Sequence, residues 1–214
     1  MTRSDIRQEQ DVKASSFERL VFRAVIRAYI PIVTVAVTYT VAMLVGITMV
    51  HAGSKYALER RDHLFVHVQQ QDKADIAFRE DERLKAVAIE VGRDAWRALR
   101  ATLEALTIVI PYPTAAYNGW YRGILSVDGG HASRLAHPIE AAYFLGYQMI
   151  QITAFSLASG AGINLTLACL RPRPYYRGDK IFILPKEALR DLLRLYVLVL
   201  PLLLLATWWE YFLA

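Results

Sequence analysis

Uncharged hydrophobic stretches alternate with charged segments along this chain, and their lengths indicate where it meets a membrane. Residues 29–50 carry no charge and are rich in Val, Ile, Ala and Thr. A helix rises about 1.5 Å per residue, so this stretch is long enough to cross a hydrocarbon layer of about 30 Å. Residues 195–214 form a second hydrophobic stretch, rich in Leu, in which Glu210 is the single charged residue. It ends in an aromatic group typical of a membrane–water interface, namely Trp208, Trp209 and Tyr211. We therefore predict the first span at 29–50 and the last at 195–214.

The region between these spans is less regular. Residues 101–127 are only moderately hydrophobic and are interrupted by Glu104, Pro111, Pro113 and Arg122. Such breaks are tolerated at membrane depth only where the freed backbone groups are covered by protein or line a wet cavity. We predict a broken, re-entrant or protein-buried span here.

Residues 141–170 form an uncharged stretch that is too long for one untilted span. It is either one long tilted helix or two shorter pieces separated near Ser159-Gly160-Ala161-Gly162. Small residues permit close helix approach and polar ones can hydrogen-bond between helices. The candidates for such packing are Gly146, Ala154, Ala158, Gly160, Gly162, Gln148, Gln151 and Asn164. Their partner is either within the chain or in another subunit, and we describe 101–170 as a region of broken and long membrane spans.

Three polar segments flank these spans. Residues 1–28 form a basic segment, with Arg19, Arg23 and Arg27 spaced as on an amphipathic helix at a membrane surface. Residues 51–100 hold ten basic and nine acidic side chains, and their apolar residues recur with helical spacing, which predicts a helical extramembrane segment.

Residues 171–194 form the third polar segment, a basic loop opened by Arg-Pro-Arg-Pro. Basic segments favour the cytoplasmic side, so 1–28 and 171–194 should share it, separated by an even number of crossings. Five crossings satisfy this condition better than four. We expect an all-α, polytopic transmembrane bundle of four to five spans in a bacterial inner membrane, with a cytoplasmic N-terminus.

Composition argues against several functional classes. The net charge of +5 is mild, and the positive-inside rule explains it more economically than nucleic-acid binding does. The single cysteine, Cys169, cannot form a disulfide or a cysteine metal site within one chain. His63 and His67 are one helical turn apart but have no third ligand nearby, so we interpret them as solvated side chains and expect no metal or cofactor.

Catalytic motifs are also missing from the sequence. Neither a phosphate-binding loop nor the serine-hydrolase or zinc-protease patterns occur. The one conceivable cluster, His137 with Asp128 or Glu140, lacks a partner nucleophile or metal triad. We expect the protein not to be an enzyme.

Acidic residues at membrane depth are costly and are therefore candidates for function. Glu140 follows Pro138, so a carboxylate in the first turn of a helix explains it more simply. Glu104 can pair with Arg100 or Arg97, a contact on the helix surface that contributes little. Glu210 lies near the interface, where solvation competes with an interhelical hydrogen bond.

The arrangement resembles the stage II sporulation protein M (SpoIIM) family of bacterial membrane proteins. The resemblance begins with Val25-Ile26-Arg27-Ala28-Tyr29-Ile30-Pro31 before the first span, with Gly46 near its end. It continues through Asn118-Gly119 with Gly123, and through His137-Pro138-Ile139-Glu140, to Glu210. The charged segment at 51–100 departs from the family pattern.

This resemblance implies an integral membrane protein without catalytic residues of its own. In spore formers the family member looks like a septal scaffold that holds peptidoglycan hydrolases, and relatives are often encoded beside a MoxR-type ATPase. We therefore expect a scaffold that assembles with other membrane or envelope proteins, linked to cell-envelope remodelling, in contact with lipid and capable of forming homo-oligomers. The alternative is an oligomeric transporter or channel subunit built on the broken helices at 101–127 and 138–170. The candidate contact residues are Asn118, Gly119, Gly123, Glu140, Gly146, Gly160, Gly162 and Glu210.

Overall fold

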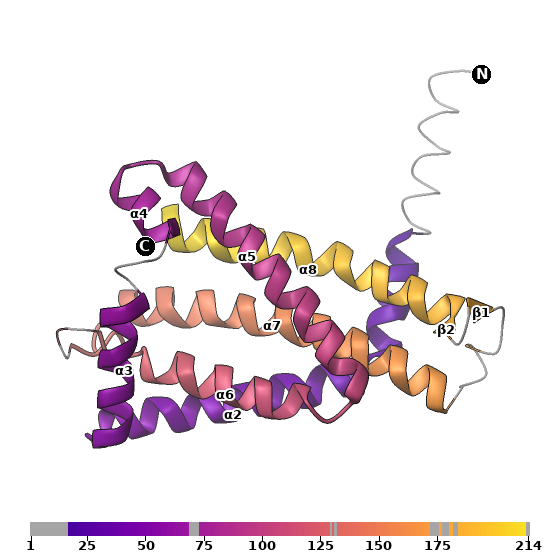
Figure 1. Ribbon diagram of the computed structural model, residues 1–214, viewed down its shortest axis with the longest axis horizontal. Helices are drawn as coiled ribbons and strands as arrows, with labels where there is room; N and C mark the ends of the chain where they lie inside the picture. Colours follow the sequence, from indigo (N-terminus) through magenta and orange to yellow (C-terminus); the bar gives the residue numbers. More distant parts are fainter. Residues whose placement is uncertain are drawn as a thin grey trace.

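The computed structural model describes nearly all of the chain as helix (Figure 1). The residues that it describes are 17–68, 73–128, 130, 132–171, 176, 180–181 and 184–212. The predicted all-α membrane bundle is therefore confirmed.

Three helices are long and apolar enough to cross a membrane: α2 (Tyr29–His51), α7 (Pro138–Leu170) and α8 (Lys186–Phe212). The predicted number of four to five spans is higher than this number. The difference comes from the helices between α2 and α7, because α5 (Arg83–Glu104) carries many charges and α6 (Pro111–Ile124) has only 14 residues.

Helices α5 and α6 form a hairpin in the middle of the chain. A short 3₁₀ turn, η1 (Ala105–Thr107), follows α5, and Ile108 then adopts a positive φ of 66° that reverses the chain. Pro111 starts α6 at the first helical position, where its missing N–H costs no hydrogen bond. The break predicted within 101–127 is thus the turn of a helical hairpin, and α6 itself is continuous.

Helix α7 is a single helix of 33 residues, without a break at Ser159-Gly160-Ala161-Gly162. Of the two alternatives for residues 141–170, one long helix is therefore the correct one. Gly160 is needed for close packing, because a Cβ there would overlap the Ile32 side chain of α2 and crowd its backbone.

The charged segment that follows α2 forms two further helices before α5. Helix α3 (Lys55–Val68) stands across one end of the bundle, and α4 (Lys73–Arg79) packs on the beginning of α5 (Figure 1). At the other end, β1 (Lys180–Ile181) and β2 (Leu184–Pro185) pair antiparallel just before α8.

The bundle has two distinct ends. The helical residues 17–27, with Arg19, Arg23 and Arg27, lie at the same end as β1 and β2, whereas α3, α4 and the C-terminal end of α8 lie at the other end (Figure 1). Both basic segments therefore sit at one end, as an even number of crossings between them requires. Residues 1–16 and most of 172–183 are outside the described residues.

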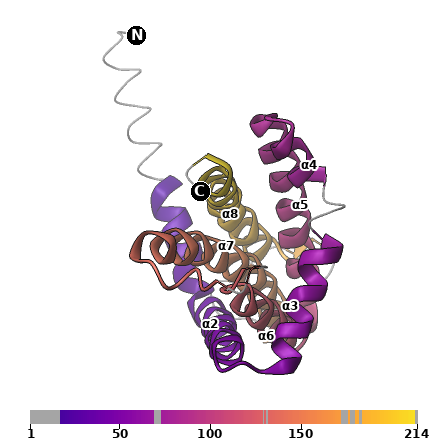
Figure 2. The same ribbon diagram turned by 90° about the vertical axis from the view of Figure 1, so that its left-hand side faces the viewer.

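Seen along the bundle, α5, α6, α7 and α8 surround a central space and α2 packs beside α6 and α7 (Figure 2). Helices α2 and α6 cross very closely, because Gly46 of one faces Gly123 of the other. A Cβ on Gly123 would overlap the Met43 carbonyl oxygen, so this crossing requires glycine. The close crossing holds α6 against α2 and leaves its other face directed at the central space.

Candidate functional site: a charged cavity inside the helix bundle

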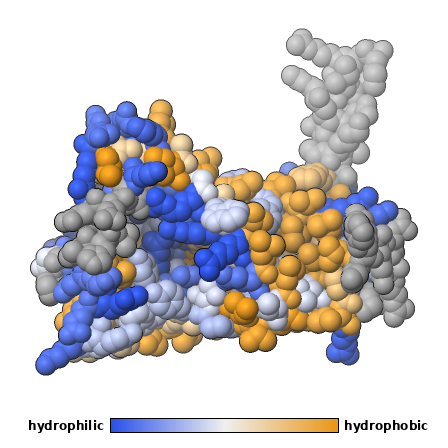
Figure 3. Space-filling model, in the orientation of Figure 1, coloured by the Kyte–Doolittle hydropathy of each residue, from blue (hydrophilic) through white to orange (hydrophobic). Residues whose placement is uncertain are grey.

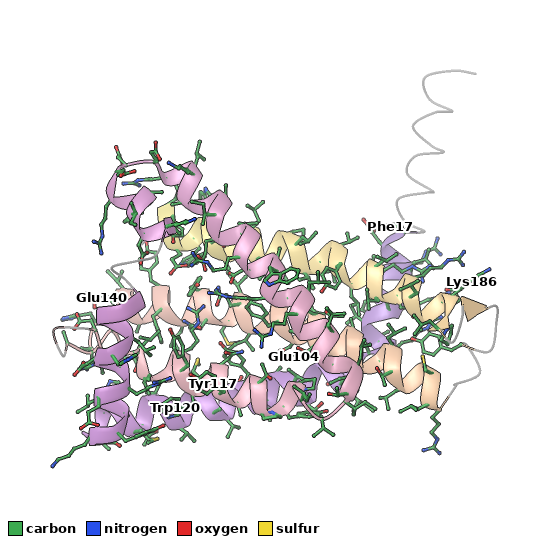
Figure 4. The ribbon with its side chains drawn as sticks, in the orientation of Figure 1. Phe17, Glu104, Tyr117, Trp120, Glu140 and Lys186 are labelled. Carbon is green, nitrogen blue, oxygen red and sulfur yellow. The ribbon has the colours of Figure 1, made fainter. Side chains whose placement is uncertain are left out.

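A cavity of about 1280 Å³ occupies the space between α5, α6, α7 and α8. Figure 3 shows it as a hollow among hydrophilic side chains, next to a surface that is mainly hydrophobic. Its lining runs from Glu140, near the start of α7, to Glu104 and Thr114 beside the turn of the α5–α6 hairpin (Figure 4). The cavity therefore extends from one end of the bundle deep between helices that are long enough to span a membrane.

Arg122 of α6 lies at the centre of a polar network that joins this helix to α2, α5, α7 and α8. Its guanidinium donates to the Tyr147 hydroxyl of α7 at 3.5 Å and lies 5.6 Å from the centre of that ring. It also interacts with Tyr39 of α2, Asp94 of α5 and Glu210 of α8. A buried guanidinium is stable only with such compensation, so the helices must keep this arrangement for the charge to be tolerated.

Gln151 extends this network toward α5. Its Nε2 donates to Asp94 Oδ2 at 3.0 Å and to the Tyr147 hydroxyl at 2.7 Å. Asp94 is fully buried and accepts a second bond from Arg97 at 2.8 Å. We call Tyr39, Asp94, Arg122, Tyr147, Gln151 and Glu210 the Arg122 network.

The cavity-facing side of α5 carries paired charges. Glu90 accepts from Arg93 at 2.7 Å and from Arg97 at 3.1 Å. Near the hairpin turn, Arg100 donates to Glu104 at 2.7 Å, and Thr114 of α6 donates to the other oxygen of Glu104 at 3.1 Å. The pair that the sequence predicted between Glu104 and Arg100 is therefore formed. The hydrogen bond from Thr114 links α5 to α6.

Several buried polar atoms that line the cavity have no hydrogen-bond partner. They are Oε1 of Gln148, Oε1 of Gln151, Oγ of Ser156 and Nε1 of Trp209. Leaving such an atom without a partner costs about 1–3 kcal/mol, so native proteins usually avoid it or fill the space with water or ligand. Four residues of the cavity wall thus have hydrogen-bonding capacity that the chain itself does not use.

A second polar cluster lies at the end of the bundle that holds the basic segments. Asp191 of α8 is fully buried and accepts from Arg27 at 2.9 Å, Arg194 at 2.7 Å and the Tyr176 hydroxyl at 3.0 Å. Asn164 of α7 donates to the same hydroxyl at 2.8 Å. We call these five residues the Asp191 lock.

Tyr176 is the central residue of this lock. Burial raises the pKa of its phenol well above the ordinary value, and the Asp191 carboxylate raises it further. The hydroxyl therefore stays protonated and can donate to Asp191. Among the described residues, no buried side-chain atom of the lock lacks a partner.

The glycines predicted from the sequence all lie at contacts within the chain. Gly119 and Gly123 pack on α2, Gly160 packs on Ile32, Gly162 on Thr102, and Gly146 on the Trp209 ring. These small-residue faces are therefore occupied by the chain's own helices.

The predicted polar candidates take different positions. Asn118 is exposed and lines the cavity, as does Glu140, which lies in the first turn of α7 after Pro138. Glu210 is half-buried and accepts a hydrogen bond from Tyr147. These three residues line one cavity, although no sequence pattern indicated that they lie close together.

Gln151 forms an interhelical hydrogen bond of the kind that the sequence predicted, but sequence reasoning missed the other members of the Arg122 network. Arg122 was noticed only as an interruption of a hydrophobic stretch, and Asp94 belonged to a segment predicted to be extramembrane. For Arg122 the available signal was a charge within a mainly apolar segment, whereas Asp94 stood among the many other charges of α5. Among the described residues no cluster of three His, Cys, Asp or Glu side chains is placed to hold a metal ion.

The fold and the cavity together define a helical membrane protein whose bundle encloses a polar site. The family model for stage II sporulation protein M matches residues 35–214, the bulk of the chain. The chain therefore belongs to the SpoIIM family, as its motifs indicated. No curated protein and no solved structure matches it significantly.

Proposed function

We propose that this chain is a non-enzymatic membrane subunit that binds a small polar ligand in the charged cavity as a step in moving that ligand through the bilayer. The observation that carries the proposal is the set of unpartnered polar atoms on Gln148, Gln151, Ser156 and Trp209. Polar groups at membrane depth are costly, and they mark ligand pathways when they line a water-filled space.

The lining specifies the chemistry of this ligand. Five arginines and six acidic residues line the cavity, so their charges nearly cancel. They are Arg93, Arg97, Arg100, Arg122, Arg134, Asp75, Glu90, Glu104, Asp128, Glu140 and Glu210. Most of the arginines are already paired with carboxylates. A strongly charged ion would find no excess of opposite charge in the lining. A zwitterion or a polyhydroxyl compound, in contrast, supplies both hydrogen-bond donors and acceptors.

The transport hypothesis drawn from the sequence rested on two helix breaks. One of them is absent, because α7 is continuous. The other is the α5–α6 hairpin turn, which places Glu104 and Thr114 at the deep end of the cavity. The cavity now supports the transport proposal in place of the missing break.

Uptake into proteoliposomes tests the proposal. Radiolabelled zwitterionic amino acids and uncharged monosaccharides serve as probes, and we expect at least one to accumulate above protein-free vesicles. Asn118→Leu and Glu140→Ala should reduce this uptake, because both residues line the cavity. Glu80→Ala is the matched control, since Glu80 is exposed and outside the lining. Uptake of no probe, or equal loss in the control, would contradict the proposal.

Assembly with other membrane or envelope proteins is the second candidate function. The observation that favours it is α3, which stands across the end of the bundle at which the cavity begins and exposes Tyr56, Glu59 and His63. Because the glycine faces are filled within the chain, partner contacts should lie on α3 rather than on α7. Copurification from native membranes that is lost in Glu59→Lys but kept in Asp81→Lys would support this role. A monomer that copurifies with nothing would contradict it.

We also propose that the protein resides in a bacterial inner membrane with its N-terminus in the cytoplasm. Arg19, Arg23 and Arg27 lie at the same end as the basic loop, and the positive-inside rule assigns that end to the cytoplasm. Protease accessibility of an N-terminal tag in oriented vesicles tests the assignment.

A further inference from the structure

Helix α5 exposes a continuous apolar stripe on the side that faces away from the bundle. Leu84, Trp96 and Leu103 are 78%, 64% and 55% exposed. With Ala88, Gly92 and Leu99, which are also exposed, they recur every three or four residues and therefore form one face. A helix at the surface of a soluble domain has the opposite arrangement, with its apolar face toward the core.

Most charges of α5 lie on the other side of the helix, whereas Lys85, near its start, is exposed beside the stripe and pairs with Glu82. Asp94 is fully buried against Gln151 of α7, and Glu90 is nearly buried between Arg93 and Arg97. The charged face thus borders the cavity and the apolar face borders the surroundings. The orientation of the two faces is therefore the reverse of that in a helix at a water-exposed surface.

The neighbours of α5 give its depth in the bundle. Ala86 and Val87 pack near Tyr211, at the C-terminal end of α8. Further along, Ala98 belongs to the same core cluster as Val199. At the far end, Thr102 lies 2.7 Å from the Tyr196 hydroxyl. Helix α5 therefore runs beside nearly the whole apolar part of α8.

The hairpin turn continues the apolar surface. Leu106, Val109 and Ile110 are exposed between α5 and α6, and Thr107 turns its hydroxyl inward to the Glu104 carbonyl. At the same depth, Ile108 of the turn packs in one cluster with Val35 of α2 and Leu167 of α7. The apolar surface of the hairpin is thus level with the apolar surface of a helix long enough to span the membrane.

We infer that α5 and the hairpin turn are inserted in the bilayer, and that the stripe from Leu84 to Leu103 is a contact surface for lipid acyl chains. The mean hydropathy of α5 is too low for it to be recognised as a membrane helix, because it carries charges that face an internal cavity instead of water outside the protein. The extramembrane position predicted for residues 51–100 is then replaced, for residues 84–100, by a position at membrane depth. This position of α5 does not depend on whether the cavity binds the proposed polar ligand.

Spin-label accessibility in proteoliposomes tests the inference. Single cysteines at Gly92, Trp96, Leu99 and Leu103 are introduced with Cys169→Ser, and each label is probed with oxygen and with a water-soluble nickel chelate. Leu204, exposed on α8, is the lipid reference, and Asp81, in the turn before α5, is the water reference. We expect the four labels to match Leu204, with oxygen collision rates several-fold above chelate rates.

Two results would overturn the inference. Labels that collide with the chelate as often as at Asp81 would place α5 in water. Labels protected from both reagents would show that protein covers the stripe. Because all four sites are exposed and outside the network, the cysteines should leave the fold intact.

Trp96 and Gly92 provide a second readout. Brominated acyl chains should quench a fluorescence component that is absent in Trp96→Phe. Gly92→Leu should leave stability unchanged, because nothing lies within 4 Å of a Cβ at that position. Absent quenching or an unstable Gly92→Leu variant would indicate a buried stripe and reject lipid contact.

Discussion

The Asp191 lock and the Arg122 network are both buried polar clusters, but they differ in how completely their atoms are paired. In the lock, one carboxylate accepts three hydrogen bonds and no buried atom of a described member is left without a partner. In and around the network, two glutamine oxygens, one serine hydroxyl and one indole N–H are buried without partners. The network borders the cavity between α5, α6, α7 and α8.

This difference separates a structural role from a ligand-binding role. A fully paired buried cluster fixes helices and has nothing left to offer a ligand. A cluster with unpaired donors and acceptors is stable only if something else supplies the bonds. The lock should therefore respond to substitution through stability, and the network should respond through ligand binding.

The largest effect on stability should come from the lock. Asp191→Ala removes the acceptor of Arg27, Arg194 and Tyr176, and breaking a buried ion pair costs about 3–5 kcal/mol. Unfolding in mixed detergent micelles measures the loss. Glu80→Ala, in the exposed turn before α5, is the control and should change stability by less than about 0.5 kcal/mol. Equal behaviour of the two variants would mean that the lock is not structural.

Arg122 should show strong coupling to Glu210. Arg122→Gln alone leaves the Glu210 carboxylate without its main cation, whereas the double variant with Glu210→Gln removes both charges. We expect the second substitution to recover part of the lost stability, with a coupling energy of about 1–3 kcal/mol. The four unfolding free energies of the cycle measure it, and strict additivity would show that the two charges do not interact.

Gln148 should separate stability from function. Gln148→Leu removes a buried acceptor that has no partner, so we expect stability to stay constant or to rise by about 1 kcal/mol. The same variant should lose uptake of the probe that wild type accumulates. Met149→Leu, an exposed neighbour on α7, should change neither quantity. A destabilised Gln148→Leu with normal uptake would assign this residue a structural role.

The smallest stability effect should come from Glu140. Its carboxylate lies in the first turn of α7, where the helix dipole favours negative charge by about 0.3–1 kcal/mol. Glu140→Gln should therefore lower the unfolding free energy by no more than that amount. Added salt should shrink the difference further, because the side chain is exposed. A larger loss would show that Glu140 has a structural partner.

The sequence predicted the parts of the fold that depend on local composition. Long hydrophobic stretches identified α2 and α8, and the prolines near 111 identified a break. Both signals can be read from a single segment of the sequence. The sequence did not reveal that Asp94, Arg122 and Gln151 meet, since helix packing brings together residues from three separate segments. Our inference for α5 also differs from the extramembrane position that the sequence predicted, because periodicity shows that a helix has two faces but not which face meets the protein.

The same limit applies to the small residues. Gly119, Gly123 and Gly160 were correctly recognised as positions where helices approach closely. Whether the approaching helix belongs to the same chain or to a partner depends on the three-dimensional arrangement. In this chain all three face its own helices.

The accessibility of Thr114 to water tests the central claim most directly. Thr114 lines the deep end of the cavity beside Glu104, whereas Leu204 is exposed on the apolar face of α8. In proteoliposomes of Cys169→Ser protein, Thr114→Cys should react with a small, charged, water-soluble thiol reagent, and Leu204→Cys should not. If Thr114→Cys is as unreactive as Leu204→Cys, the interior of the bundle is dry and the proposed ligand site is contradicted.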